Sequence, residues 1–231
     1  MYGNLTYFIF ALPALLLALY AQAKVKSAFT KFSGVPNARR ISGFQAAQVL
    51  LSASGLGNVD VEGAQGMLAD HYDPRSKRLR LSPDVAQRPS VAAIGVVAHE
   101  VGHALQDHTG YLPLRIRSGL VPAVNLGSWL GPIIFMVGVL LLPTTNVAWV
   151  GVLLFSLSAV FALVTLPVEL DASRRAMQLL TTNGLVTTAE EKAGVSSVLS
   201  AAAWTYVAAV AQALSTLLYY VLILTGGRRR R

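Results

Sequence analysis

The pentapeptide His99-Glu100-Val101-Gly102-His103 holds the residue types of a catalytic zinc site. An α-helix turns about 100° per residue, so histidines four positions apart lie on one face, about 6 Å from each other. Two such imidazoles can share one tetrahedral Zn²⁺, and Glu100 can take a proton from a water at the metal's open position. Gly102 has no side chain, which lets another element approach closely. The pattern predicts a zinc-dependent hydrolase with Glu100 as its base.

The residues around the motif predict that it lies on a helix over residues 90–108. An apolar run without proline leads into it, Ser90 suits the N-cap position, and Thr109-Gly110 ends it. The alternative interpretation is a surface histidine pair beside a carboxylate, with no metal. The strongly apolar approach to the motif argues against it, because buried His and Glu side chains need partners.

The composition is that of a membrane protein. Of the 231 residues 54% are hydrophobic and 13% are charged, whereas about a quarter of the residues of soluble domains are charged. Apolar runs that can each supply the ~20 residues needed to cross a bilayer account for the difference. We expect about four transmembrane helices, over residues 5–23, 119–142, 147–167 and 204–225. The short link Pro143–Asn146 predicts that the second and third form an antiparallel hairpin.

Residues 24–118 form the long polar region and predict a zincin-like α+β metallopeptidase domain at the membrane surface. The pattern indicates a helix over residues 42–55, strands over 59–62, 66–72 and 78–82 with a turn over 73–77, and then the metal helix. This order is typical of zinc peptidases. Residues 168–195 form a second polar segment, which we expect to carry the third zinc ligand, and residues 226–231 form a basic tail. The predicted fold class is therefore an α-helical multi-pass membrane protein with this domain attached.

Charge predicts the orientation of the chain. The net charge of +8 lies in loops beside the apolar runs, without aromatic or motif context for DNA or RNA, so no nucleic-acid partner is expected. Basic residues gather on the side of the histidine motif: Lys24, Lys26, Lys31, Arg39, Arg40, Arg115, Arg117, Arg174 and Arg175. The opposite side carries the terminal arginines. The positive-inside rule therefore predicts a cytoplasmic active site.

A catalytic zinc site needs a third protein ligand. The chain has no cysteine, so histidines and carboxylates are the candidates. His108 lies on the opposite face of the metal helix and suits the helix end. Asp107 better suits orienting His103 or capping the helix. Glu190 and Glu191 resemble the acidic first turn of a helix.

Glu169 and Asp171 remain as candidates for the third ligand. Glu169 is favoured because it lies where the third membrane helix emerges, a costly place for an unpaired carboxylate, and a zinc ion would remove that cost. The alternative is an interfacial ion pair of Glu169 with Arg174 or Arg175.

Four segments carry a resemblance to a known family: Asp70-His-Tyr-Asp-Pro-Arg75, Leu79-Arg-Leu-Ser82, Ala98-His-Glu-Val-Gly-His-Ala104 and Pro167-Val-Glu-Leu-Asp-Ala-Ser-Arg174. In this order, over nearly the whole chain, they closely resemble the YugP-like neutral zinc metallopeptidases. The resemblance implies a multi-pass enzyme of the bacterial cytoplasmic membrane with a gluzincin-type site. It implies one Zn²⁺ per chain, with His99, His103 and Glu169 as ligands and Glu100 as the catalytic base.

A more distant similarity is to the HtpX/Ste24-type membrane peptidases. Those usually have an aspartate four residues after the glutamate ligand, where this chain has Ser173. We therefore expect Asp171 or Asp107 to support a histidine ligand instead, and Ser173 itself stays a candidate for such a contact.

The predicted function is a membrane-bound zinc metalloendopeptidase, with a polypeptide substrate and the lipid bilayer as partners. His71, Tyr72 and Arg174 are candidates to stabilise the oxyanion. An extended substrate is expected to pair with an exposed strand, either residues 66–70 or 78–82. Membrane-protein partners and self-association both stay open.

Two alternatives to this function are considered. An intramembrane-cleaving zinc protease is disfavoured because the apolar stretch Ser90–Leu105 has only 16 residues. A non-catalytic zinc-stabilised scaffold or partner-binding protein would not need Glu100.

Overall fold

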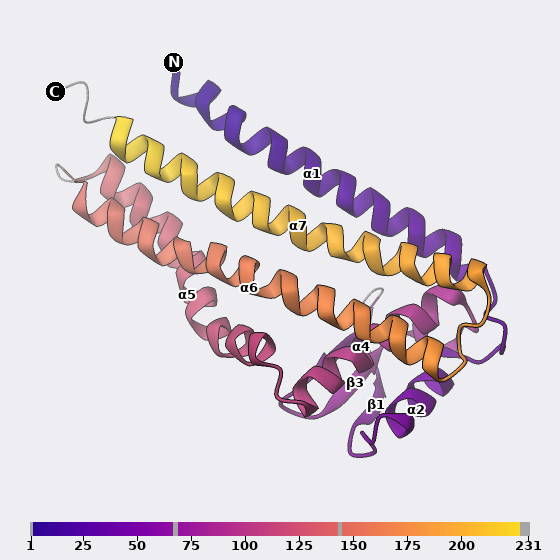
Figure 1. Cartoon of the computed structure of the whole chain (residues 1–231). Helices are drawn as coiled ribbons and strands as arrows, with labels where there is room; N and C mark the ends of the chain where they lie inside the picture. Colours follow the sequence, from indigo (N-terminus) through magenta and orange to yellow (C-terminus); the bar gives the residue numbers. More distant parts are fainter. Residues whose placement is uncertain (1, 67–68, 143–144, 227–231) are drawn as a thin grey trace. The chain divides into compact units, whose positions relative to one another are not determined.

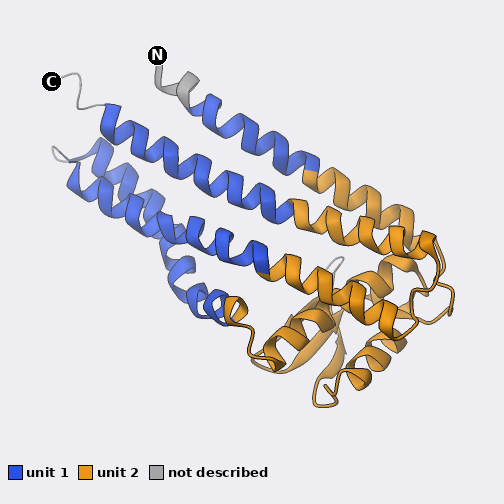
Figure 2. Cartoon of the chain, viewed as in Figure 1, with its two compact units in different colours: residues 1–20, 115–167, 205–231 blue, residues 21–114, 168–204 orange. Residues whose placement is uncertain are grey.

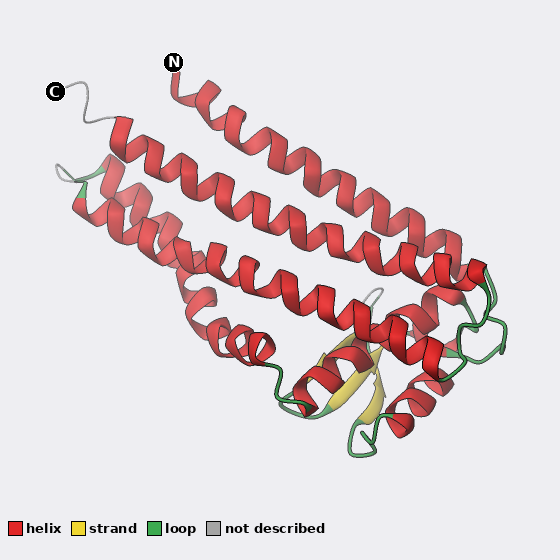
Figure 3. Cartoon of the chain, in the orientation of Figure 1, coloured by secondary structure: helices red, strands yellow, loops and turns green. Residues whose placement is uncertain are grey.

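A computed structural model shows a mainly helical chain with one small sheet (Figures 1 and 3). It describes residues 2–66, 69–142 and 145–226. The helices are α1 Tyr2–Ser33, α2 Gly43–Ala53, α3 Pro83–Gln87, α4 Val91–His108, α5 Leu112–Leu140, α6 Asn146–Thr182 and α7 Ala189–Gly226. The strands are β1 Asp60–Gly63, β2 His71–Asp73 and β3 Arg78–Leu81. The chain divides into unit 1, residues 1–20, 115–167 and 205–231, and unit 2, residues 21–114 and 168–204 (Figure 2).

Within the described residues, four helices are long and apolar enough to cross a membrane: α1 from Tyr7, α5, α6 and α7. Each contains one of the predicted spans, except that α5 ends two residues before residue 142. The helices also run further than the spans. Residues 24, 168 and 204, where we expected segments to change, lie inside α1, α6 and α7. Hydropathy indicates where side chains leave an apolar environment, whereas the backbone hydrogen bonds of a helix continue until a residue interrupts them. The helices can therefore be longer than the apolar spans. The basic tail and part of the predicted link at residues 143–146 lie outside the described residues.

Unit 1 is built from close helix contacts. A Cβ added to Gly138 of α5 would lie 2.3 Å from the Ala148 backbone nitrogen of α6, and one added to Gly151 would lie 2.4 Å from the Phe135 nitrogen. Phe135 also stacks on Tyr220 of α7, with ring centroids 4.0 Å apart. Such contacts suit helices in lipid, where packing at small residues replaces the hydrophobic drive of water.

The sheet of unit 2 has the strand order β1-β3-β2. β3 pairs in parallel with β1 and antiparallel with β2, with Leu79 opposite Tyr72. β1 and β3 confirm two of the predicted strands to within a residue. The third prediction is only partly right: β2 begins at His71, Ala69 and Asp70 are not in a strand, and residues 67–68 lie outside the described part. The Asp70 carboxylate instead accepts hydrogen bonds from the Ser82 backbone nitrogen and hydroxyl.

The predicted helix starts of unit 2 are confirmed. Ser42 and Gln45 form a capping box at the start of α2. The Ser90 hydroxyl accepts a hydrogen bond from the Ala93 N–H, 3.1 Å away, at the start of α4. α4 ends at His108, followed by Gly110 with a φ of +64°. The short helix α3 was not predicted.

The core of unit 2 lies around α4, whose side chains Ile94, Val97 and Val101 are fully buried. At Gly102 the backbone of α6 comes close: a Cβ there would lie 2.7 Å from the Ala172 carbonyl oxygen. The predicted close approach at Gly102 is confirmed. Because Glu169 precedes Ala172 by three residues, it shares that face of α6, so this crossing directs its side chain toward the histidines of α4.

Candidate metal centre

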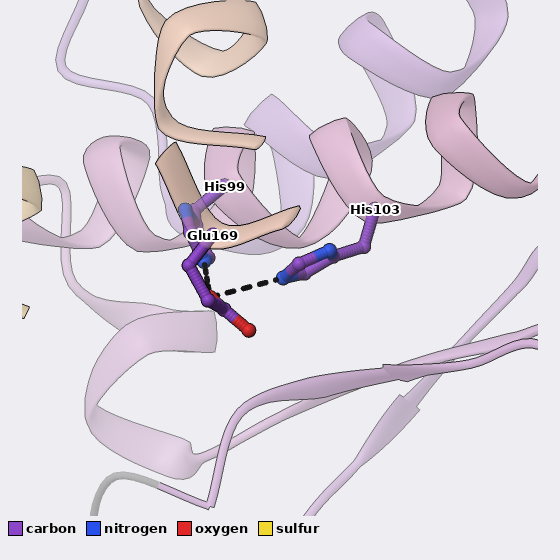
Figure 4. Close-up of side chains that lie close together, drawn as sticks. All are labelled: His99, His103 and Glu169. Atoms are coloured by element: carbon purple, nitrogen blue, oxygen red, sulfur yellow. Dashed lines mark hydrogen bonds and ion pairs between the residues drawn. The ribbon is translucent and has the colours of Figure 1, made fainter. Parts of the chain in front are cut away.

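Three side chains of unit 2 converge on one point. His99 and His103 come from α4 and Glu169 comes from α6; Figure 4 shows both imidazoles directed at the Glu169 carboxylate. The distance from Glu169 Oε2 to Nε2 is 3.1 Å for His99 and 3.4 Å for His103. One possible ligand atom from each residue lies within 4.8 Å of the others.

This donor set fits zinc. Zinc binds imidazole nitrogen and carboxylate oxygen, and two ligand atoms about 2.0–2.1 Å from a tetrahedral ion lie about 3.4 Å apart. The two nitrogen–oxygen distances match that separation. Glu169 is only 2% exposed. A carboxylate so buried is costly without a cation or hydrogen-bond donors, and a metal ion would supply the charge.

The ion pair that we considered as the alternative for Glu169 forms elsewhere. Arg174 and Arg175 both pair with Asp171, and Arg175 Nε lies 2.5 Å from Asp171 Oδ2. Asp171 is therefore placed to hold these arginines, and Glu169 is the carboxylate that meets the two imidazoles.

Glu100 is buried beside the three residues. Its Oε2 accepts a hydrogen bond from the Tyr72 backbone N–H of β2, 2.9 Å away. Burial raises the pKa of the Glu100 carboxyl, while His99, His103 and the Tyr72 N–H act in the opposite direction. A raised pKa makes the carboxylate a stronger base, which suits the transfer of a proton.

Gln106 is a contact that sequence reasoning missed. It is fully buried, and its Oε1 lies 2.9 Å from Nδ1 of His103. Its Nε2 donates to the Val168 carbonyl at 2.8 Å and to Asp171 Oδ2 at 2.9 Å. The available signal was a glutamine three residues after the second histidine, on the same face of an apolar helix. Asp171 thus reaches His103 through Gln106.

Ser173 and Asp107, both candidates to support a histidine, lie in different surroundings. The Ser173 hydroxyl lies 3.3 Å from Nδ1 of His99, so the residue at the position of the missing aspartate does contact a histidine of the site. Asp107 instead accepts hydrogen bonds from the Tyr72 hydroxyl at 2.7 Å and from Lys77 Nζ at 2.5 Å. It therefore ties β2 and the following turn to the end of α4, and Gln106 occupies the place beside His103.

The candidate oxyanion residues lie in different surroundings. The His71 side chain contacts the Ala69 carbonyl oxygen at 2.8 Å and Arg80 at 3.4 Å. The Arg174 side chain is 69% exposed and pairs with Asp171. Burial, together with the hydrogen bond to Asp107, raises the pKa of the Tyr72 hydroxyl, so it remains a donor to that carboxylate. Of the three residues, Tyr72 alone has a described contact with Glu100, through its backbone.

Comparisons with known proteins agree with the chemistry of this site. Residues 7–225 match the protein family described as "Putative neutral zinc metallopeptidase". The chain is 45% identical over 222 residues to the "Putative membrane protease YugP" of Bacillus subtilis (strain 168). The aligned residues make up 96% of this chain and 98% of that protein. No solved structure matches the chain. The family match includes α4 and α6, which carry the converging residues, and the chain belongs to this family.

Proposed function

We propose that this membrane protein is a zinc-dependent endopeptidase that holds one Zn²⁺ per chain with His99, His103 and Glu169. The observation that carries the proposal is the convergence of two imidazole nitrogens on one buried carboxylate oxygen at separations typical of neighbouring zinc ligands. Family membership supports it. We further propose that the helix, small sheet and metal helix of unit 2 form a zincin-like domain.

When bound, a zinc ion would lower the pKa of a water molecule and polarise the carbonyl of the scissile peptide bond. The Glu100 carboxylate would take the proton from the attacking water and later give it to the leaving amine. The Tyr72 N–H would hold Glu100 in place for this transfer. The apolar surroundings of α4 would limit the access of other water and strengthen these electrostatic interactions.

For the substrate, we propose an extended polypeptide that lies along β2. Residues 78–82 were the other candidate, but they contain β3, the central strand, which already pairs on both sides and offers no free edge. β2 is an edge strand, and the Tyr72 N–H on its outer side already reaches Glu100. A substrate strand added at this edge would therefore lie beside the proposed base.

For the location, we propose the bacterial cytoplasmic membrane, with the metal site on the cytoplasmic side. The support is the set of basic residues near the ends of the apolar runs on that side of the chain, from Lys24 to Arg175.

The two alternative functions are less well supported. α4 is not among the four candidate spans found in the described residues, which argues against cleavage inside the bilayer. A zinc-stabilised scaffold would not need a buried glutamate with a raised pKa beside the ligands.

The substitution Glu100→Gln tests the proposed function. It keeps the size of the side chain and its acceptor for the Tyr72 N–H but removes the base, so we expect zinc to remain bound and cleavage of an unfolded protein to fall by at least about 100-fold. Glu190→Gln, at an exposed position of α7, is the matched control. Unchanged cleavage by Glu100→Gln, or joint loss of zinc and cleavage, would contradict the role given to Glu100.

A further inference from the structure

The orientation of the Gln106 amide is set by its partners. The two groups near Nε2, the Val168 carbonyl and the Asp171 carboxylate, are hydrogen-bond acceptors only. Both hydrogens of the amide nitrogen are therefore directed at them, and the remaining amide atom that meets His103 is an acceptor oxygen. A reversed amide would place oxygen against two acceptors.

We propose that Gln106 is a positioning residue that fixes the tautomer and the direction of the His103 imidazole for metal binding, an inference that rests on the proposed zinc site. An acceptor 2.9 Å from Nδ1 requires the proton of the neutral ring to lie on Nδ1. Nε2 is then the nitrogen left to bind the metal, and it is Nε2 that lies beside Glu169 Oε2. The ring is thus held with Nε2, and not Nδ1, directed at the proposed metal position.

The two histidines differ in this respect. The neighbour of His99 Nδ1 is the Ser173 hydroxyl, at 3.3 Å, and a hydroxyl can either donate or accept. Ser173 therefore does not dictate which nitrogen of His99 carries the proton. Gln106, which has no such freedom, dictates it for His103.

The acceptors of Gln106 are themselves held in place. Arg174 and Arg175 pair with Asp171, which keeps its oxygens directed toward donors. Arg175 also lies over the ring of Tyr111, 5.6 Å from its centroid, and the Tyr111 N–H donates to the Gln106 backbone carbonyl at 2.9 Å. Gln106 is thus fixed through both its backbone and its side chain, as a positioning residue must be.

The first test is zinc affinity, measured by competition with a chelator, for wild type and Gln106→Met. Methionine fills a similar volume without a hydrogen-bonding amide. We expect the affinity to fall roughly 10- to 100-fold, as for other groups that orient metal-bound histidines. Gln178→Met makes the same change at an exposed position of α6 and should bind zinc like wild type. Wild-type zinc affinity in Gln106→Met would overturn the proposal.

Exchanging the amide of Gln106 with the carboxylate of Asp171 distinguishes an effect on the orientation of His103 from an effect on folding. Gln106→Glu retains an acceptor for Nδ1 but confronts Asp171 with a second carboxylate, so we expect weaker zinc binding than in wild type. Adding Asp171→Asn restores a donor between the two side chains and should recover at least about ten-fold of the affinity, in the range that such supporting contacts contribute. A double variant no better than Gln106→Glu alone would overturn the proposal.

The thermal midpoint of each zinc-free variant shows whether it is folded. If wild type binds zinc but cleaves no peptide, the proposed endopeptidase activity is wrong. The measurements of zinc affinity would still test the role of Gln106.

Discussion

The two units of the chain divide its chemistry unequally. All 11 acidic residues and all four histidines fall in the ranges of unit 2, and unit 1 contains none. Unit 1 is held by backbone contacts at glycines and by aromatic packing. Unit 2 combines an apolar core around α4 with buried polar side chains that form hydrogen bonds; Gln106, which donates to the Val168 carbonyl, is an example.

This difference shows what each unit requires of its interior. Unit 1 requires close approach, so its critical residues are those that have no side chain. Unit 2 requires in addition that the buried polar groups around the candidate site find partners, because an unmatched one is costly. Substitutions that disturb only packing should therefore act on stability in unit 1, and on both stability and chemistry in unit 2.

The largest effect is expected from Gly102→Ala in unit 2. The added methyl group would meet the Ala172 carbonyl oxygen at 2.7 Å, a backbone atom, so α6 must move away and carry Glu169 with it. A displacement of about 1 Å at a reactive site can lower the rate about 100-fold. We expect a loss of this size in proteolysis, together with weaker zinc binding. Gly95→Ala in the same helix is the control, because its methyl group would make only an ordinary 3.5 Å contact with Val195. Equal activities would contradict the proposed dependence on the crossing.

Gly138→Ala in unit 1 provides the comparison. Its methyl group would lie 2.3 Å from the Ala148 nitrogen, so α5 and α6 must separate. We expect a loss of about 1–3 kcal/mol in the free energy of unfolding, as for other overpacked contacts, with the zinc affinity of the folded protein unchanged. Unfolding in detergent with and without zinc measures both. Gly119→Ala in α5, where a methyl group meets open space, should be neutral. A fall in zinc affinity as large as that of Gly102→Ala would refute the division between the units.

A smaller effect is expected from Tyr72→Phe. The substitution removes the hydroxyl that donates to Asp107 but keeps the backbone N–H that holds Glu100. Loss of one such hydrogen bond costs about 1 kcal/mol of stability. We expect kcat to fall only a few-fold, with zinc affinity unchanged. Activity reduced as strongly as in Glu100→Gln would mean that the Tyr72 hydroxyl itself takes part in the reaction.

Sequence reasoning predicted those features that depend on local spacing. The histidine pair, the cap at Ser90 and the close approach at Gly102 each follow from residue types within a few turns of one helix, and the structure contains all three. Which strands form the two edges of the sheet could not be predicted from the sequence, because strand order depends on pairing between separate segments. The extent of β2 was also missed, since the Asp70 side chain bonds to Ser82 twelve residues away.

The supports of the site were the hardest part to predict. Gln106 depends on partners 62 and 65 residues along the chain, and its own position in an apolar helix gives little indication of them. Asp171 and Glu169 were indistinguishable in charge and two residues apart. Their contacts separate them: Glu169 meets the histidines of α4, whereas Asp171 meets Gln106 and the two arginines.

The zinc content of purified wild type and of Glu169→Ala tests the central claim most directly. We predict one zinc per wild-type chain and loss of that zinc in Glu169→Ala, together with the loss of proteolysis, because two histidines alone do not make a catalytic zinc site. Zinc retained at wild-type stoichiometry and affinity in Glu169→Ala would contradict the account and would move the third ligand to another carboxylate.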